Sequence, residues 1–463
     1  MKLFNSLTRH VEEFEPREKG KVGMYTCGPT VYHLPTIGNW RTNVLSDLLK
    51  KSFKYLGYEV KSVMNLTDVG HLVSDGDEGE DKLEKAAKKE GKDAWEMAEF
   101  YIKDFKKGMN KLNIETPEVL PRATEHIKEQ IELIKKIEEA GLTYKTSDGV
   151  YFNVEEYEKK GSEYGVMSSL DQIKEGVRVE VNKEKKDPRD FALWKFSREG
   201  EKRQMEWESP WGVGFPGWHI ECSAMSMKYL GEQFDVHVGG EDLMSTHHPN
   251  EVAQAEAGTG KKPVVKYWLH GAFLLVDGGK MGKSLGNAYT LEDIEKKGFS
   301  ALDLRYFYLT GHYHKQLNFS WEALEAAKEA RLKLKRLVTG WKDEEGEKRG
   351  EKVKEWEERF KQALENDLQM PQVLAVVWEM SKNEELSGVE KLFLITKFDQ
   401  LLGLGLVEKK TEEIPVEILG LVEKRNKARE EKKWDEADKM REEIEKKGYK
   451  VLDGEKGVKV EKV

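Results

Sequence analysis

A strand–helix–strand pattern near the N-terminus constrains the fold more than any other feature of the sequence. Residues Lys21 to Cys27 form an apolar run that ends at a Gly-Pro pair, as is typical of a buried strand entering a turn. Apolar residues recur at helical spacing from Trp40 to Tyr55, and Tyr58 to Leu66 has the composition of another strand. These segments predict a βαβ unit with a right-handed crossover, which is half of a nucleotide-binding α/β fold.

The middle of the chain indicates an interrupted second half of the same sheet. A helical stretch from Ala94 to Leu112 is followed by residues 122–190, which contain strand-like pieces and a run rich in Lys and Glu. The α/β pattern resumes at Phe191 and reaches an apolar strand, Phe234 to Gly240, that ends on two glycines. We therefore interpret residues 122–190 as an insertion between the two halves of the sheet.

The last third of the chain has the composition of helices. Beyond Trp321 the residues are almost all helix-forming, with weak boundaries between Gly403 and Pro415. Lys, Arg and Glu alternate from Ile418 to Lys447, as expected for a pair of amphipathic helices, and strand-like pieces follow to Val463. The sequence thus predicts a helical bundle and then a small C-terminal domain.

Composition limits the class of protein. With 463 residues, of which 38% are hydrophobic, the chain can build several domains with substantial cores. The sequence contains no run of about 18 apolar residues and starts without the apolar segment of a signal peptide. Two cysteines argue for a reducing compartment, so we expect a cytoplasmic protein without a membrane partner. The net charge of −9 means that any RNA-binding surface must be a local basic patch.

The two cysteines are candidates for a metal site. Cys27 and Cys222 lie in sharply patterned segments, and His247 and Glu251 follow at a spacing of four residues, which places them on one face of a helix. Two thiolates, one imidazole and one carboxylate suit tetrahedral Zn²⁺. Because the cysteines are far apart in the sequence, two inert buried thiols or a disulfide are the alternatives at this point.

Several short segments, taken together and in order, resemble one known family. These segments are TCGPTVY (26–32), TIGN (36–39), NLTD (65–68), DPRDFALWK (187–195), PGWHIECSAM (216–225), HVGGEDL (237–243), HHPNEVAQ (247–254), KMGKSLGN (280–287) and LNFS (317–320). The combination resembles cysteinyl-tRNA synthetase, a class I aminoacyl-tRNA synthetase, over nearly the entire chain. TIGN and KMGKS stand where the family has its HIGH and KMSKS signatures.

The resemblance implies a Rossmann-type catalytic domain with an insertion, followed by an α-helical bundle and a small anticodon-binding domain. The expected boundaries are 1–121 for the first half of the catalytic domain, 122–190 for the connective insertion, 191–270 for the second half, 271–322 for the KMSKS-loop and stem-contact region, 323–406 for the helical bundle and 411–463 for the anticodon-binding domain.

The resemblance also implies that Cys27, Cys222, His247 and Glu251 are ligands of one Zn²⁺. Zinc is useful here because cysteine and serine differ by one atom, and packing alone separates near-isosteres by only about 10 to 200-fold. Zn²⁺ deprotonates a coordinating thiol and has little affinity for a neutral hydroxyl. The expected pocket residues are Thr67, Trp218 and His237, with His219 and His248 nearby, although each could equally be a structural residue.

The implied reaction is two-step acyl transfer that uses ATP with Mg²⁺ as substrate. The carboxylate of L-cysteine attacks the α-phosphate, pyrophosphate leaves, and a ribose hydroxyl at the 3′ end of tRNA(Cys) then takes the acyl group. Lys280 and Lys283 are the expected catalytic residues, positioned over the triphosphate. The residues expected to bind ATP are Thr36, Gly38, Asn39, Gly239, Gly240, Asp242 and Lys283.

The resemblance places tRNA contacts in the C-terminal domain, where Arg425 to Arg429 supply cations and Trp434 an aromatic ring. We expect a monomer. Two other functions are possible: a ligase that joins cysteine to a small amine, or a non-catalytic paralogue that binds zinc and nucleotide. Relatives of the first kind lack the C-terminal portion.

Two departures from the family signatures favour the non-catalytic alternative, namely Thr36 at the first position of HIGH and Gly282 at the third position of KMSKS. A histidine at the first position would donate a hydrogen bond to a phosphate oxygen. We predict that the Thr36 hydroxyl and His33 share this role, the alternative being that Thr36 only packs.

Overall fold

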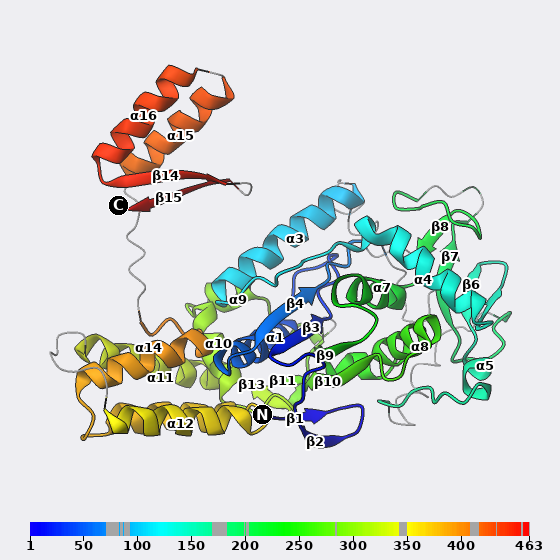
Figure 1. Cartoon of the computed structure of the whole chain (residues 1–463), viewed down its shortest axis with the longest axis horizontal. Coiled ribbons are helices and arrows are strands. Elements are labelled where there is room, and N and C mark those ends of the chain that lie inside the picture. The colour runs from blue at the N-terminus through cyan, green and yellow to red at the C-terminus, as the bar shows by residue number, and fades with distance from the viewer. Residues whose placement is uncertain are drawn as a thin grey trace. The chain divides into compact units, whose positions relative to one another are not determined.

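A computed structural model of the chain describes residues 1–70, 83, 87, 93–168, 183–198, 200, 203–282, 285–341, 350–407, 416–431, 433–454 and 457–462. The chain forms two compact units, Met1–Leu406 and Val407–Val463. Figure 1 shows the course of the elements in each. No helix among the described residues is long and apolar enough to cross a membrane.

A four-stranded parallel sheet lies at the centre of unit 1. It consists of β3 (Lys21–Thr26), β4 (Glu59–Met64), β9 (Phe234–Gly240) and β10 (Val265–Gly271), in the order β10-β9-β3-β4. Helix α1 (Ile37–Tyr55) connects β3 to β4, so the predicted βαβ unit is confirmed. The chain leaves β3 toward β4 on one side, while β9 and β10 extend the sheet on the other. The switch point between β3 and β9 is where parallel sheets bind ligands.

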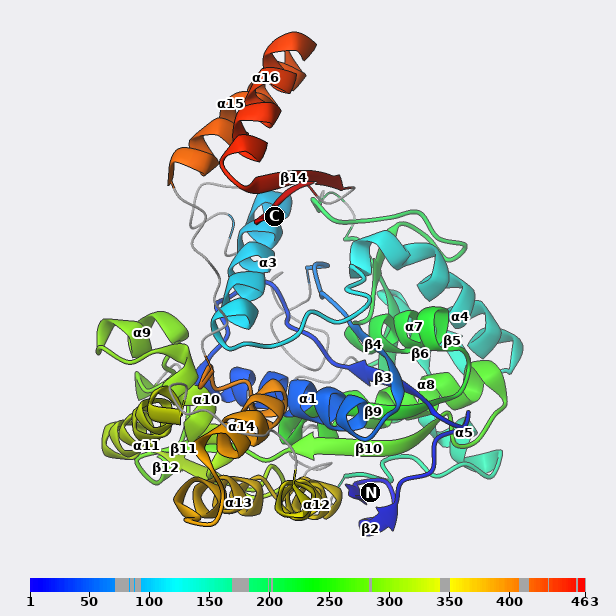
Figure 2. The same cartoon turned by 60° about the vertical axis from the view of Figure 1, so that its left-hand side comes forward.

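Helices cover both faces of this sheet, as Figures 1 and 2 show. Helix α1 packs against all four strands, and α7 (Trp218–Leu230) contacts β3 and β4. The connection from β9 to β10 crosses the sheet in the direction opposite to the connection from β3 to β4. Because crossovers between parallel strands are right-handed, α8 (His247–Thr259), which connects β9 to β10, lies on the face opposite α1. With both faces covered, the carboxyl halves of β3 and β4 are buried, as are six of the seven residues of β9.

The insertion contains a separate antiparallel sheet, in the order β5-β6-β7-β8. Its strands are β5 (Thr143–Lys145), β6 (Gly149–Phe152), β7 (Phe191–Phe196) and β8 (Gly214–Pro216). The sequence analysis assigned residues from Phe191 onward to the second half of the catalytic domain. Strands β7 and β8 lie beyond that boundary, yet they extend the antiparallel sheet of β5 and β6. An apolar run does not show whether its strand joins a parallel or an antiparallel sheet, and the domain boundaries stay predictions.

The remaining elements of the α/β part of unit 1 surround these two sheets. They are β1 (Lys2–Asn5), β2 (His10–Glu13), α3 (Ala94–Lys111), η1 (Ala123–His126), α4 (Ile127–Glu139), α5 (Val154–Lys159), η2 (Glu241–Met244), β11 (Leu274–Val276), β12 (Gly279–Lys280), α9 (Leu291–Lys296), α10 (Ala301–Leu309) and β13 (Leu317–Phe319).

A bundle of four long helices completes unit 1. These helices are α11 (Trp321–Trp341), α12 (Glu351–Glu365), α13 (Met370–Lys382) and α14 (Gly388–Leu402). Ser387 begins α14 with a capping box, and Gly403, at φ 66°, ends it in the left-handed region that glycine adopts without strain. The bundle confirms the helical composition, although it is part of the same compact unit as the catalytic sheet.

Unit 2 has a small core of its own. Helices α15 (Val416–Glu430) and α16 (Trp434–Lys446) form an antiparallel pair, and β14 (Tyr449–Gly454) pairs with β15 (Gly457–Lys462) in a hairpin. Ile418, Leu421, Val422, Ile444, Tyr449 and Val451 form the core. The predicted helix pair followed by strands is confirmed. Trp434 is 57% exposed, whereas Arg425 is 2% exposed and belongs to the interior of this unit.

Candidate active site and metal centre

A cavity of about 250 Å³ opens at the switch point between β3 and β9. Residues that directly follow these two strands line it, because the carboxyl ends of parallel strands meet at one edge of the sheet. The lining includes Cys27, Asn39, Phe105, Trp218, Gly240 and Asp242. The cavity therefore joins a predicted metal ligand to predicted nucleotide and cysteine contacts.

The N-terminus of α1 forms one wall of this cavity. Thr36 is the N-cap, and its Oγ1 accepts a hydrogen bond from the backbone N–H of Asn39 at 3.4 Å. The Asn39 Oδ1 accepts from the Thr36 backbone N–H and from the Thr36 hydroxyl, each at 2.9 Å. A helix N-terminus presents backbone N–H groups and a partial positive charge, which suits a phosphate.

The loop after β11 lies against this helix N-terminus. The backbone N–H of Ile37 donates to the Tyr289 carbonyl at 2.8 Å, and a Cβ built on Gly38 would be 3.6 Å from the Met281 sulfur. Asn287 holds the loop together, since its Oδ1 accepts from the Gly282 N–H at 2.8 Å. The TIGN and KMGKSLGN segments are therefore neighbours, as the predicted ATP site requires.

Of the two predicted catalytic lysines, only one lies among the described residues. Lys280 ends β12, opposite Leu275, and is exposed. Lys283 lies outside the described residues, so its role stays a prediction.

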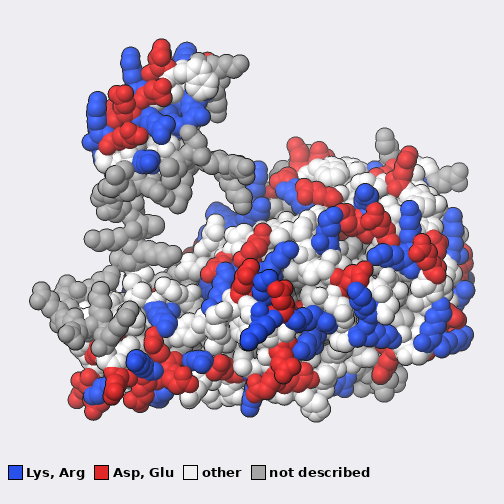
Figure 3. Space-filling view, in the orientation of Figure 1, with Lys and Arg blue, Asp and Glu red and all other residues white. Residues whose placement is uncertain are grey.

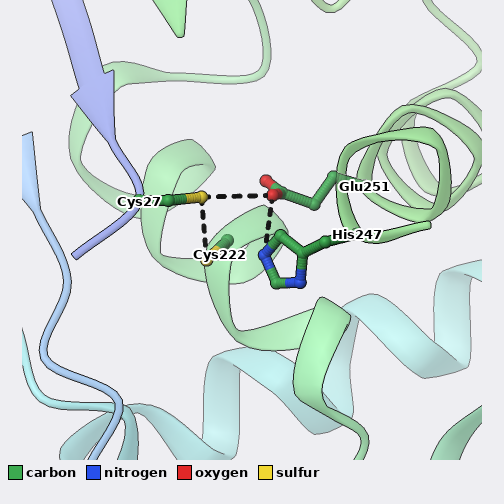
Figure 4. Close-up of side chains that lie close together, drawn as sticks. All are labelled: Cys27, Cys222, His247 and Glu251. Atoms are coloured by element: carbon green, nitrogen blue, oxygen red, sulfur yellow. Dashed lines mark hydrogen bonds and ion pairs between the residues drawn. The ribbon is translucent and has the colours of Figure 1, made fainter. Parts of the chain in front are cut away.

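The four predicted metal ligands come together (Figure 4), and one of them, Cys27, lines the cavity. One donor atom from each of Cys27, Cys222, His247 and Glu251 lies within 4.8 Å of all the others. The two sulfurs are 3.8 Å apart, the Cys27 sulfur is 3.5 Å from Glu251 Oε1, and His247 Nε2 is 3.0 Å from the same oxygen. A disulfide bond requires about 2.05 Å between sulfurs, and both cysteines are free thiols.

The electrostatics of the cluster fit a cation. Burial raises the pKa of the Glu251 carboxyl well above its ordinary value, because removal from water disfavours the charged carboxylate. Burial also raises the pKa of the Cys27 thiol, while the hydrogen bond with Cys27 lowers the pKa of Cys222. A divalent ion would neutralise the carboxylate and both thiolates. Nitrogen, sulfur and oxygen donors in this proportion suit Zn²⁺.

A neighbouring hydroxyl is also left without a partner. Tyr25, on β3, is fully buried, and its Oη makes no hydrogen bond with a described residue. Burial and the charges of Cys222, Cys27 and Glu251 raise its pKa well above the ordinary value. An orphaned donor beside thiolates is the arrangement expected of a site whose sulfurs become acceptors when they bind a metal.

A row of buried histidines surrounds the cluster. His237 Nε2 is 3.3 Å and His248 Nε2 is 3.4 Å from the Cys27 sulfur, so these two also form a possible donor set with Cys27 and Glu251. Burial lowers the pKa of both imidazoles well below its ordinary value. His248 is also hydrogen-bonded to His270 at 2.6 Å. Burial therefore favours the neutral form of these rings.

The other predicted site residues differ in their exposure to the cavity. Trp218 lines it, with its ring centroid 4.4 Å from that of His247. Thr67 and His237 are 3% and 1% exposed and are not among the cavity-lining residues. A Cβ at Gly239 would lie 2.3 Å from the His248 ring, so packing of the histidine requires this glycine, and its contact with nucleotide stays a prediction.

Comparisons with known proteins agree with this geometry. A family model described as tRNA synthetases class I (C) catalytic domain matches residues 13–329, and one described as cysteinyl-tRNA ligase anticodon binding domain matches residues 411–460. The chain is 43% identical to the cysteine–tRNA ligase of Treponema denticola over 96% of each chain. It is 40% identical to that of Thermococcus gammatolerans over 99% of this chain and 98% of the relative.

The chain belongs to the cysteine–tRNA ligase family. The family match includes the C-terminal portion that the small-amine ligases lack. Among solved structures, methionyl-tRNA synthetase of Mycobacterium tuberculosis in complex with methionyl-adenylate has a TM-score of 0.55, covering 87% of this chain and 93% of that chain. At 14% identity this likeness shows the class I synthetase fold alone.

One residue near the site of this cysteine–tRNA ligase homologue was missed by the sequence analysis. Arg41, on α1, is 5% exposed, and burial lowers its pKa to about 10. Its guanidinium donates to four carbonyl oxygens at 2.6 to 3.1 Å, from Ala272, Phe273, His312 and Lys315. It thereby attaches the start of β11, which leads to the KMGKS segment, to the helix that begins with TIGN. An Arg on an amphipathic helix normally indicates a solvated face, so no sequence signal identified it.

Proposed function

We propose that this chain is a cysteine–tRNA ligase that activates L-cysteine with ATP and transfers it to the 3′ end of tRNA(Cys). One observation carries the proposal: Cys27 belongs to the buried donor cluster and also lines the cavity formed by the TIGN helix and the strand ends. Substrate thiol and nucleotide would thus meet at the switch point of the sheet. We expect a cytoplasmic monomer.

Cys27, Cys222, His247 and Glu251 would hold one Zn²⁺ per chain. When bound, Zn²⁺ favours a thiolate over a neutral hydroxyl and so selects cysteine against serine. Trp218, which lies over His247, would exclude water from the bound side chain. Burial disfavours the charged form of the His237 and His248 imidazoles beside these donors.

The first step needs positioning more than a protein nucleophile. The cysteine carboxylate attacks the α-phosphorus, and the bond to the pyrophosphate oxygen breaks. Gly38, Asn39 and the N-terminal N–H groups of α1 would bind phosphate, and Asp242 the ribose. Lys280 and Lys283 would neutralise charge that builds up on the leaving pyrophosphate, with Mg²⁺ carried by the nucleotide.

Cysteine-dependent exchange of pyrophosphate into ATP, followed by charging of tRNA(Cys), tests the function. We expect both activities. Exchange without charging would favour a ligase for small amines, and the absence of both would favour a non-catalytic paralogue.

Thr36→Val should slow cysteine-dependent pyrophosphate exchange several-fold. Valine has nearly the same shape but lacks the hydroxyl that caps α1, and loss of a cap costs about 0.5–2 kcal/mol. The helix N–H groups that would face phosphate then lose their fixed position. His33→Ala should add to the loss if His33 shares the phosphate contact. Exchange at the parental rate in both variants would show that Thr36 and His33 only pack.

Deletion of the residues from Thr411 onward should leave pyrophosphate exchange largely intact and weaken tRNA charging. Unit 2 has its own core, so its removal spares the core of unit 1. Charging and tRNA affinity should be measured at matched salt, because phosphate contacts depend on ionic strength. Equal tRNA affinity with and without the segment would contradict an RNA-binding role.

A further inference from the structure

The turn between α12 and α13 has a strained backbone. Asp367 and Leu368 are consecutive non-glycine residues with φ of 54° and 49°, in the left-handed region. Aspartate tolerates this conformation, whereas in leucine the Cβ crowds the following carbonyl oxygen. Both residues are buried, at 7% and 1% exposed. Strain of this kind persists only where surrounding contacts fix the backbone, so the contacts of this turn must hold it in place.

Asp367 is the centre of those contacts. Its Oδ1 accepts hydrogen bonds from the Tyr313 hydroxyl at 2.5 Å and from the Phe4 backbone N–H at 2.8 Å. Its carbonyl oxygen lies 2.7 Å from His312 Nε2. Burial, together with the charge of Asp367, raises the pKa of the Tyr313 phenol well above its ordinary value, so the phenol keeps the proton that it donates. Asp367 thus holds residues 312–319, which follow α10 and include β13, and which we call the support segment.

The Asp367 carboxylate differs from the charges on the surface of unit 1. On the face drawn in Figure 3, acidic and basic side chains are interspersed in water, where solvent screens their interactions. The Asp367 carboxylate is buried, and one of its oxygens accepts from two donors. Hydrogen bonds to a buried charged group are the strong ones. Removal of the Tyr313 hydroxyl should therefore loosen the support segment measurably.

The support segment holds the β11–β12 hairpin. The Tyr313 carbonyl accepts from the Ala272 backbone N–H at 2.9 Å, directly before β11. Strand β13 then pairs in parallel with β11 along its whole length. At the turn of the hairpin, the Asn318 Oδ1 accepts from the Gly278 N–H at 2.7 Å. The position of the hairpin therefore depends on the position of the support segment.

The hairpin carries a cation that is expected to meet the nucleotide. Lys280 ends β12, at the start of the KMGKS segment. On its other side the support segment is tied to the TIGN helix, because Arg41 donates to the His312 and Lys315 carbonyls at 3.1 and 2.6 Å. A lysine that neutralises a leaving group acts through its position, and a misplacement of about 1 Å can cost about a hundredfold in rate.

We propose that Asp367 is a positioning residue for the hairpin that binds the β- and γ-phosphates of ATP. Asp367 fixes the support segment through Tyr313, and the support segment fixes Lys280. This inference rests on the proposed function, because the hairpin acts only where ATP binds beside α1. The helical bundle would thus set the contact with the leaving pyrophosphate without touching the nucleotide. The donor cluster is built on the end of β3, α7 and α8, which this chain of contacts does not include.

The test compares ligands with and without the β- and γ-phosphates, in the full-length chain. Tyr313→Phe keeps the ring and removes the hydroxyl that donates to Asp367. It should reduce kcat/KM for ATP in cysteine-dependent pyrophosphate exchange about tenfold. A sulfamoyl analogue of cysteinyl-adenylate lacks both phosphates, so its inhibition constant should change by less than about twofold. KM for cysteine and the zinc content should also stay at the parental values.

The matched control is Tyr306→Phe. The buried Tyr306 hydroxyl, on α10, accepts from Trp378 Nε1 of α13 at 2.9 Å. This variant also loses a hydroxyl contact with the bundle, but the support segment keeps its hydrogen bonds. It should use ATP and bind the analogue as the parent does. Asp367→Ala should show the same difference between ATP and the analogue as Tyr313→Phe, with a larger loss for ATP.

Two results would overturn the proposal. One is a parental kcat/KM for ATP in Tyr313→Phe. The other is an equal loss for ATP and for the sulfamoyl analogue, because the hydroxyl would then only stabilise the fold. A parent protein without cysteine-dependent exchange would refute the proposed function and this inference with it, whereas either result in a parent that does exchange would refute this inference alone.

Discussion

Cys222→Ala should remove zinc from the purified protein and reduce cysteine-dependent pyrophosphate exchange by orders of magnitude. Cys222 is one of four donors within 4.8 Å of one another, and its loss leaves three ligands for an ion that needs four in a closed site. Without the ion, the pocket can distinguish cysteine from serine only by how well each side chain packs. Zinc content should be measured by elemental analysis, and exchange with both amino acids. His247→Ala should behave in the same way.

The matched control for this prediction is Ser226→Ala, one turn further along α7. Ser226 is buried, and its hydroxyl donates within the helix to the Ser223 carbonyl, so zinc content and exchange should be near those of the parent. A Cys222→Ala protein with one zinc per chain would contradict the ligand assignment. A parent protein without zinc that still rejects serine would contradict the role of the metal in discrimination.

Arg305→Met should lower the free energy of unfolding of unit 1 by about 3–5 kcal/mol, the usual cost of breaking a buried ion pair. Arg305 and Asp47 are both fully buried, and Nη2 is 2.6 Å from the Asp47 Oδ2. The same guanidinium donates to the Leu402 and Leu112 carbonyls at 2.6 and 2.8 Å. Methionine fills most of the volume but leaves the Asp47 carboxylate and two carbonyls with fewer partners.

Urea denaturation followed by tryptophan fluorescence measures this loss. The control is Lys54→Met, because the Lys54–Glu115 pair at 2.8 Å is about 40% exposed on both sides and should contribute less than about 1 kcal/mol. Adding Asp47→Leu to Arg305→Met should lower the stability further, because Asp47 also pairs with the buried Lys51 at 2.9 Å and its loss takes this partner from the Lys51 ammonium. Equal stability of Arg305→Met and the parent would show that water solvates this pair.

The sequence by itself determined the elements with strong periodicity. The βαβ unit at Lys21 to Leu66, the strand Phe234–Gly240 and the helix pair of unit 2 all lie where their patterns predict them. Spacing alone also placed His247 and Glu251 on one helix face, where they are 3.0 Å apart. Periodicity predicts such features because it records which side chains of one segment are buried together.

Only the tertiary structure decided which segments meet. An apolar run does not reveal its partner strand, so β7 and β8 belong to the antiparallel sheet of the insertion instead of the parallel sheet. Cys27 and Cys222 are 195 positions apart, and their sulfurs meet at 3.8 Å because β3 and α7 pack together. Arg41 and Arg305 are ordinary helix residues in sequence, yet both bind carbonyls of distant segments. Contacts of this kind depend on packing between elements, which no local pattern records.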